Sequence, residues 1–188
     1  MAKSKDNVVM EGASGKIGRM LVFRQRADQT IIARRAKKTS KPITDQQQEI
    51  RNRFTEAAYY AKSAIEDPIL KQAYQDKAKL GQTAYNVAFA DYLKAPELRK
   101  AFLETYTGAV GDIVLFRIVD SFQIRSVQVE LKDAAGNVLE VGTAVQQLNK
   151  MDWLFQTTVA NQPIAGSSFH LTITDTPNNV VKVAVMVD

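Results

Sequence analysis

The chain has 188 residues, of which 45% are hydrophobic and none is cysteine, and its formal net charge is +5. This length can bury one good core or two smaller ones, and no apolar run reaches the eighteen residues expected of a membrane-spanning helix. The lack of cysteine excludes disulfides, thiolate catalysis and cysteine-based zinc sites.

The positive charge is concentrated at the N-terminus. Residues 1–41 contain eleven Lys and Arg against three acids, residues 42–108 contain nine of each, and residues 109–188 contain five against eight. The three stretches therefore carry net charges of +8, 0 and −3. This asymmetry predicts contact with a nucleic acid or with the acidic surface of a neighbouring copy.

Residues 1–41 are predicted to form a basic arm that contains a β-hairpin. Apolar runs at 20–23 and 29–35 flank a turn at Ala27-Asp28, which places Phe23 opposite Ile32. A two-stranded ribbon is marginal alone, and the glycine-rich stretch before it reads as a flexible lead-in, so we expect the arm to be mobile until it docks. The expected assembly residues are Met20, Val22, Phe23, Ile31 and Ile32, and the expected basic contacts are Lys16, Arg19, Arg24, Arg26, Arg34, Arg35, Lys37 and Lys38.

The middle third is predicted to be a small bundle of three helices. Thr44 and Gln47 have the spacing of a capping box, and Ile50 and Phe54 begin the apolar stripe of an amphipathic helix. Asp67-Pro68 has the pattern of a second helix start. The expected bundle covers residues 42–100, with helices over 45–65, 68–81 and 83–93.

From residue 101 the hydrophobic period changes from helical to alternating. Six strand-like segments separated by turn signals predict a β-sandwich of immunoglobulin type over 101–188, with Trp153 in its core. The expected fold class is therefore α+β. The last strand, 180–187, is apolar on both faces and needs cover on both sides. Its residues Val180, Val181, Val183, Val185 and Val187 are the candidate acceptor for a strand from another copy.

Several segments resemble a group of small uncharacterised proteins from Bacteroidota-type bacteria. These segments are GASGKIGRMLVFRQR at 12–26, KPITDQQQEIRNRF at 41–54, AYNVAFADYLKAPEL at 84–98, DAAGNVLEVGTAVQ at 133–146 and DWLF at 152–155. The resemblance implies a Gly/Lys-rich N-terminal β arm, a helical middle and a bacterial immunoglobulin-like end, and it implies no catalytic residue. Such immunoglobulin-like modules occur in surface, fibre and phage-tail proteins, which favours a structural role.

The residues with chemical potential have simpler interpretations. His170, the single histidine, is expected at a solvent-facing strand position, and no Ser-His-Asp set surrounds it. GASGKIGR lacks the GxxxxGK[ST] order of a phosphate loop. Five aspartates near strand ends are interpreted as turn residues and not as calcium ligands; they are Asp112, Asp120, Asp133, Asp152 and Asp175.

These patterns favour a non-enzymatic structural subunit that self-assembles. No cofactor or small-molecule substrate is expected, and the N-terminal arm would reach into the next copy, producing a filament or tube. Two alternatives stay open: a nucleic-acid-associated protein that uses the basic arm, and a phage-tail or injection-apparatus component. Without a signal peptide pattern, a cytoplasmic location is the default expectation, and extracellular or appendage association by non-classical export is the alternative.

Overall fold

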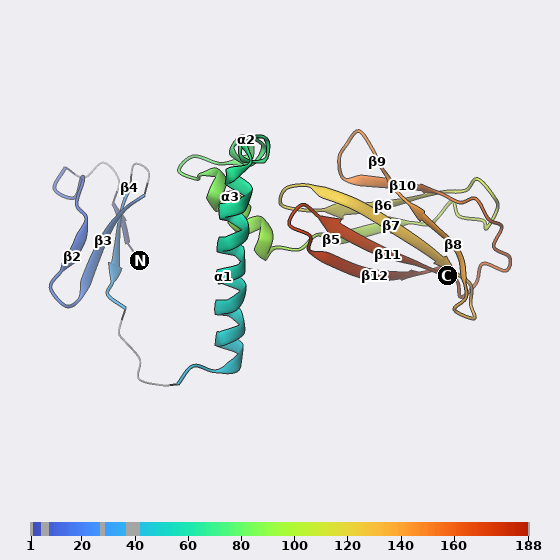
Figure 1. Ribbon diagram of the computed structural model, residues 1–188, viewed down its shortest axis with the longest axis horizontal. Helices are drawn as coiled ribbons and strands as arrows, with labels where there is room; N and C mark the ends of the chain where they lie inside the picture. The colour runs from blue at the N-terminus through green and yellow to red at the C-terminus, as the bar shows by residue number, and fades with distance from the viewer. Residues whose placement is uncertain (1, 5–7, 27–28, 37–41, 188) are drawn as a thin grey trace.

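The computed structural model describes residues 2–4, 8–26, 29–36 and 42–187. These residues form an α+β protein with three helices and three four-stranded sheets. Figure 1 shows the parts in chain order, with the helices between the N-terminal sheet and the two C-terminal sheets.

The N-terminal sheet contains the predicted hairpin and two further strands. Phe23 pairs with Ile32, as the sequence indicated, while the predicted turn at Ala27-Asp28 lies outside the described residues. The sequence predicted a flexible segment before a two-stranded ribbon. This prediction is wrong, because Gly15, at φ +104°, begins a third strand that pairs with the hairpin. The strand order is β1-β4-β3-β2, with β1 at Ala2–Ser4, β2 at Gly15–Ile17, β3 at Leu21–Arg26 and β4 at Gln29–Arg34.

The N-terminal sheet has a small core of its own. The hydroxyl of Thr30 donates to the carbonyl oxygen of Met10 at 2.8 Å, and the amide of Gln25 donates to the carbonyl oxygen of Ala13 at 2.7 Å. These bonds hold the segment before β2 over one face of the sheet. As a result, Phe23 is only 5% exposed.

The three helices begin at the residues that their caps predict. The N–H of Gln47 donates to the hydroxyl of Thr44, and the side chain of Gln47 accepts from the N–H of Thr44, which confirms the capping box. The second helix ends before the predicted Gly81, because the N–H of Ala78 donates to the carbonyl oxygen of Gln75 and closes the last turn. The helices are α1 (Asp45–Glu66), α2 (Pro68–Lys77) and α3 (Ala84–Leu93).

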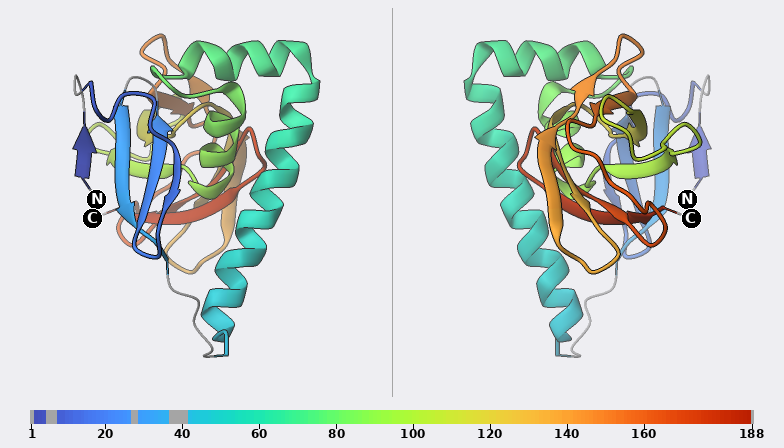
Figure 2. Two further views of the ribbon diagram at one scale, coloured as in Figure 1. Left: turned by 90° about the vertical axis from the view of Figure 1, so that its left-hand side faces the viewer. Right: turned by 90° about the vertical axis from the view of Figure 1, so that its right-hand side faces the viewer.

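The helices pack through small and aromatic side chains at the C-terminal half of α1. Ala57 and Ala61 are fully buried, which lets α3 approach closely, and Tyr74 of α2 stacks on Phe122 with ring centroids 4.0 Å apart. Residues 45–56 of α1 are all exposed. In Figure 2, α1 runs along one side of the molecule, and α2 crosses the C-terminal end of α1.

The two C-terminal sheets pack face to face around one hydrophobic core. Phe116 from one sheet and Phe169 from the other meet edge to face with ring centroids 5.9 Å apart, and Trp153, predicted as a core residue, is 5% exposed. The sheet orders are β5-β6-β10-β9 and β12-β11-β7-β8. The strands are β5 (Glu97–Phe102), β6 (Ile113–Val119), β7 (Ile124–Lys132), β8 (Val138–Thr143), β9 (Val145–Gln146), β10 (Asp152–Gln156), β11 (Ser168–Asp175) and β12 (Val180–Met186).

The first strand of these sheets starts earlier than the sequence indicated. β5 begins at Glu97, so residues 97–100 pair with β6 and do not belong to the helices, although the expected helical domain extended to residue 100. The reason is Pro96, which cannot continue a helix and leaves the chain extended directly behind α3.

Two glycines with positive φ provide a matched test of packing in the C-terminal sheets. A Cβ at Gly108 (φ +80°) would overlap the carbonyl oxygen of Asn161 and the side chain of Ile164, whereas a Cβ at Gly136 (φ +86°) would meet nothing within 4 Å. Gly136→Ala is expected to lower the free energy of unfolding by about 1–2 kcal/mol through backbone strain alone. Gly108→Ala is expected to lower it by about 3 kcal/mol or more, because the clash adds to the same strain.

Urea unfolding of both variants beside the natural chain measures the difference. Equal losses for the two variants would show that residues 161–164 can move away from Gly108 at little cost.

Candidate functional site

The last strand, β12, forms the edge of its sheet, and among the described strands it pairs with β11 alone. The N–H of Val187 donates to the carbonyl oxygen of Ser167, and bonded pairs alternate along an antiparallel ladder. The odd-numbered residues of β12 therefore direct their backbone N–H and C=O groups toward β11. The even-numbered residues direct these groups outward, away from the sheet; they are Val180, Lys182, Ala184 and Met186.

The side chains of β12 divide between a covered and an open face. Val181 and Val185 pack against the core, and Val187 is 6% exposed, so these candidate acceptor residues are already covered within the chain. On the opposite face Val180 is 55% exposed and Met186 is 58% exposed. The sequence indicated that both faces of this strand need cover. Its inner face is covered by the core, so the outer face and the edge of the strand are the parts that stay open.

The usual protections of an edge strand are sparse along β12. Its pairing with β11 runs over seven residue pairs without a bulge, and Lys182 is the one charged side chain in VVKVAVM. Long, regular, apolar edges of this kind accept further strands. The opposite edge of the same sheet, β8, is interrupted by a bulge at Leu131/Lys132 of its partner strand.

Most of the predicted assembly residues of the N-terminal arm lie in strands that are already paired. β3 lies between β2 and β4, and β4 lies between β1 and β3, so both strands of the hairpin are already paired on both sides. Phe23 is buried in the sheet, and Val22, Ile31 and Ile32 are partly buried. Met20, in the turn before β3, is 65% exposed.

The predicted basic contacts fall into separate groups. Lys16, Arg24 and Arg26 lie on one face of the N-terminal sheet, because Lys16 pairs with Val22 and the pleat alternates along β3. Arg34 pairs with Leu21 and so lies on the opposite face. Arg19 and Arg35 lie in the flanking turn and loop, and Lys37 and Lys38 lie outside the described residues.

The acids of the C-terminal sheets are committed to bonds within the fold. Asp152 accepts from Arg117 at 2.8 and 2.9 Å, and Glu140 accepts from the N–H and hydroxyl of Thr158. The backbone N–H of Thr107 lowers the pKa of Asp112 below its usual value. Asp152 is therefore neutralised within the fold, whereas Asp112 and Glu140 accept from neutral groups and keep their charge.

A buried hydrogen-bond network joins the helices to the C-terminal sheets. Asp91 of α3 is fully buried and accepts from the hydroxyls of Tyr74, at 2.9 Å, and Ser121, at 2.8 Å. The hydroxyl of Tyr74 is also 2.8 Å from that of Tyr60 on α1. Burial raises the pKa of Asp91 from 3.8 to about 6, against the lowering effect of the two hydroxyl donors.

The sequence interpretation missed this junction, although it contained a signal. Asp91 follows Ala84 and Ala88 at spacings of four and three residues, which places a carboxyl group on the buried face of α3. Its partner Ser121 lies in the connection between β6 and β7 and can be identified only from the tertiary structure.

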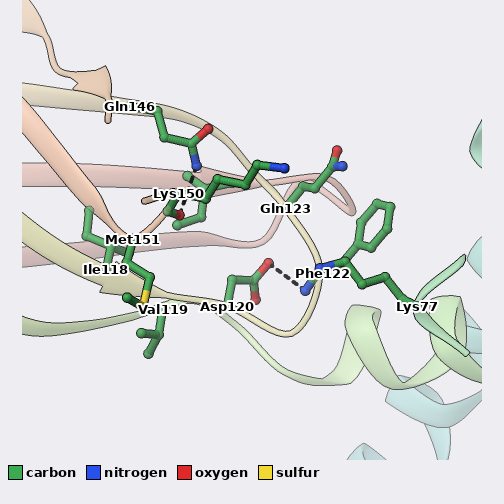
Figure 3. A pocket seen from close by; sticks show the side chains of 10 residues that line it. Lys77, Ile118, Val119, Asp120, Phe122, Gln123, Gln146, Lys150 and Met151 are labelled. Atoms are coloured by element: carbon green, nitrogen blue, oxygen red, sulfur yellow. Dashed lines mark hydrogen bonds between the residues drawn. The ribbon is translucent and has the colours of Figure 1, made fainter. Parts of the chain in front are cut away.

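A surface hollow of about 480 Å³ lies near this junction, between α2 and the loops of the C-terminal sheets (Figure 3). Asp120 accepts from the N–H of Phe122 at 3.4 Å, and the side chain of Gln146 donates to the carbonyl oxygen of Lys150 at 3.1 Å. Both bonds fix loop conformation. The lysines that line the hollow, Lys77 and Lys150, come from α2 and from the loop before β10.

The other residues with chemical potential take structural positions. The ring of His170 is 3.1 Å from the hydroxyl of Ser168 on the outer face of β11. Asp133 and Asp175 accept the N–H groups of Asn137 and Asn179 within turns. In the part of the chain that the structure describes, no three or more His, Asp or Glu side chains are grouped to hold a metal ion.

Comparison with known proteins assigns no family to this chain. No protein-family profile matches it, and no curated protein matches it. A search of solved structures finds CopC from Methylosinus trichosporium, at 12% identity and a TM-score of 0.37, covering 48% of this chain and 88% of that one. Within the described residues, no helix is both long and apolar enough to cross a membrane.

The raised pKa of Asp91 predicts a specific pH dependence of stability. The folded protein binds this proton more tightly than the unfolded chain, so the contribution of Asp91 is fully present below pH 3.8 and is lost as the pH rises to about 6. Asp91→Asn has no charge to bury. Its stability relative to the natural chain is therefore expected to increase between pH 4 and 7, by roughly 3 kcal/mol from the size of the pKa shift.

Urea unfolding of both proteins across this pH range measures the effect. Asp91→Ala serves as the control, because it also removes the charge but leaves the hydroxyls of Tyr74 and Ser121 without their acceptor. A constant difference between Asp91→Asn and the natural chain at all pH values would mean that Asp91 titrates normally.

Proposed function

We propose that this protein is a non-enzymatic structural subunit that self-assembles by strand addition at β12. In this proposal the two C-terminal sheets form an immunoglobulin-like sandwich, and a second copy supplies the added strand. The observation that carries the proposal is the row of outward backbone groups on Val180, Lys182, Ala184 and Met186.

A second β12 fits this edge in an antiparallel register centred on Val183. In that register Lys182 of one copy lies opposite Ala184 of the other, and Val180 lies opposite Met186. All four are residues whose backbone groups point outward, so each pair can exchange two N–H···O=C bonds. The register would join two four-stranded sheets into one sheet of eight strands.

The side chains of β12 are compatible with the same register. The charge on Lys182 meets a methyl group and not the second Lys182, so no like charges are opposed. The exposed side chains of Val180 and Met186 would cover each other on the outer face. Residues opposite each other in an antiparallel pair share a face, so the inner valines of both copies stay on the side of the core.

This contact replaces the arm donation expected from the sequence. The hairpin strands β3 and β4 have no free edge, whereas β12 has one. A two-fold pairing of β12 is isologous and closes after two copies. The filament or tube expected from the sequence stays a prediction and requires a second, different contact.

Ala184→Pro tests the proposal. The N–H of Ala184 points outward and takes no part in the ladder with β11, so proline at this position is expected to leave the fold intact. Each dimer would lose two intermolecular hydrogen bonds and gain a steric conflict. We expect association to weaken by about tenfold or more, from roughly 1 kcal/mol for each bond lost. Sedimentation equilibrium of nuclease-treated, full-length protein measures this.

Val141→Pro is the matched control. Val141 lies on β8 at the opposite edge of the same sheet, is 63% exposed, and also directs its N–H outward, because the neighbouring Ala144 bonds to Val127. This variant should associate as the natural chain does. If Ala184→Pro associates with undiminished affinity, or if the natural chain is monomeric at high concentration, the β12 contact is wrong.

A further inference from the structure

The N-terminal sheet has one face that is basic and open. Along β3, Val22, Arg24 and Arg26 alternate with Leu21, Phe23 and Gln25, so the two sets occupy opposite faces. Lys16 of β2 pairs with Val22, and Lys3 of β1 pairs with Ile31, which itself pairs with Arg24. This cationic face therefore contains Lys3, Lys16, Arg24 and Arg26 around the partly buried Val22, Ile31 and Ala33.

The other face of the sheet is closed by the chain itself. Gln25 and Thr30 lie on that face, and both bond to the segment that precedes β2, at the carbonyl oxygens of Ala13 and Met10. Phe23 is buried beneath the same segment. The sheet thus has a complete core on one side and presents its cations on the other.

The four cations have no electrostatic partner within the described residues. None of them forms an ion pair there, in contrast to Arg117, which is bound to Asp152. The described strands of this sheet contain no Asp or Glu. A face with four unneutralised positive charges is maintained at a cost in self-repulsion and is suited to a polyanion.

We propose that the cationic face binds the phosphate backbone of a nucleic acid duplex, without reading its sequence. Strands lie about 4.8 Å apart, so β1 and β2, at the two edges of the sheet, are separated by about 14 Å. This spacing is close to the width of the major groove, about 12 Å. Lys3 and Lys16 can contact phosphates on opposite sides of a groove, while Arg24 and Arg26, on β3 beside β2, contact phosphates along the same backbone as Lys16.

The composition of the face selects a duplex backbone over other partners. Phe23, the one aromatic side chain in the sheet, is buried on the opposite face, so no ring is presented to stack on the bases of a single strand. A second copy is a weaker fit, because Asp152 and Glu130 of the C-terminal sheets are already paired with Arg117 and Lys132 within the fold.

Fluorescence anisotropy with a labelled DNA duplex of about 30 base pairs tests the proposal, using full-length protein over a range of salt concentrations. Four phosphate contacts predict a slope of about −3.6 in a plot of log affinity against log salt concentration. Affinity would then fall about 150-fold between 50 and 200 mM salt. Duplexes of different sequence should bind with similar affinity, since only the backbone is contacted, whereas an RNA duplex, whose major groove is narrow, should bind more weakly.

Variants on the two faces of the sheet separate contact at the cationic face from general charge. Arg24→Gln with Arg26→Gln removes two contacts and should reduce the slope to about −1.8, with only about a 12-fold loss between the same salt concentrations. Arg34→Gln removes one charge from the opposite face of the same sheet, so the slope should stay near −3.6, whereas Arg24→Gln alone should reduce it to about −2.7. Lys3→Gln with Lys16→Gln is a second test at the edges of the face and should reduce the slope as the first pair does.

Three outcomes would overturn the proposal. They are the lack of duplex binding at low salt, an equal loss of slope in Arg24→Gln and Arg34→Gln, and tighter binding to a single strand than to the duplex. If Arg24→Gln with Arg26→Gln instead abolishes self-association in nuclease-treated protein, the partner of this face is a second copy. Ala184→Pro should bind the duplex with the natural salt slope, so the strand addition at β12 and this proposal can fail separately.

Discussion

The pleat of the β-strand is the constraint on which the surfaces of this protein depend. It sends successive side chains to opposite faces of a sheet and successive backbone groups to opposite edges. In the N-terminal sheet it separates Arg24 and Arg26 from Phe23, so that charge and core do not compete for one face. In β12 it directs the groups of Ala184 outward while Val183 bonds to β11, which leaves the edge open without weakening the sheet.

Local patterns in the sequence were sufficient to predict elements whose cause is local. The register of Phe23 opposite Ile32 and the capping box of Thr44 and Gln47 depend on residues within a few positions of each other, and both are confirmed. The strands β1 and β2 were missed because each has three residues and acquires its structure from pairing with the hairpin. The early start of β5 depends likewise on its partner β6.

The candidate site shows the same division between local and tertiary information. The apolar character of β12 is visible in VVKVAVM, but its place at the edge of the sheet depends on the order β12-β11-β7-β8. The helical spacing of Asp91 indicates burial, whereas its two hydroxyl donors come from α2 and from the loop after β6. The sequence shows that residues 1–41 carry an excess of positive charge. Only the strand register shows which of these charged side chains share a face of the sheet.

The unequal burial of α1 along its length has a consequence for its internal motion. Residues 45–52 are exposed, whereas the ring of Phe54 meets that of Phe89 on α3, and Ala57, Ala61 and Ala64 are buried. A helical segment without a packed face has little beyond its own backbone bonds and its cap to resist fraying. Amide protons in the first two turns of α1 should therefore exchange with deuterium through local opening, whereas those of the last turns should exchange only when the whole junction with the C-terminal sheets comes apart.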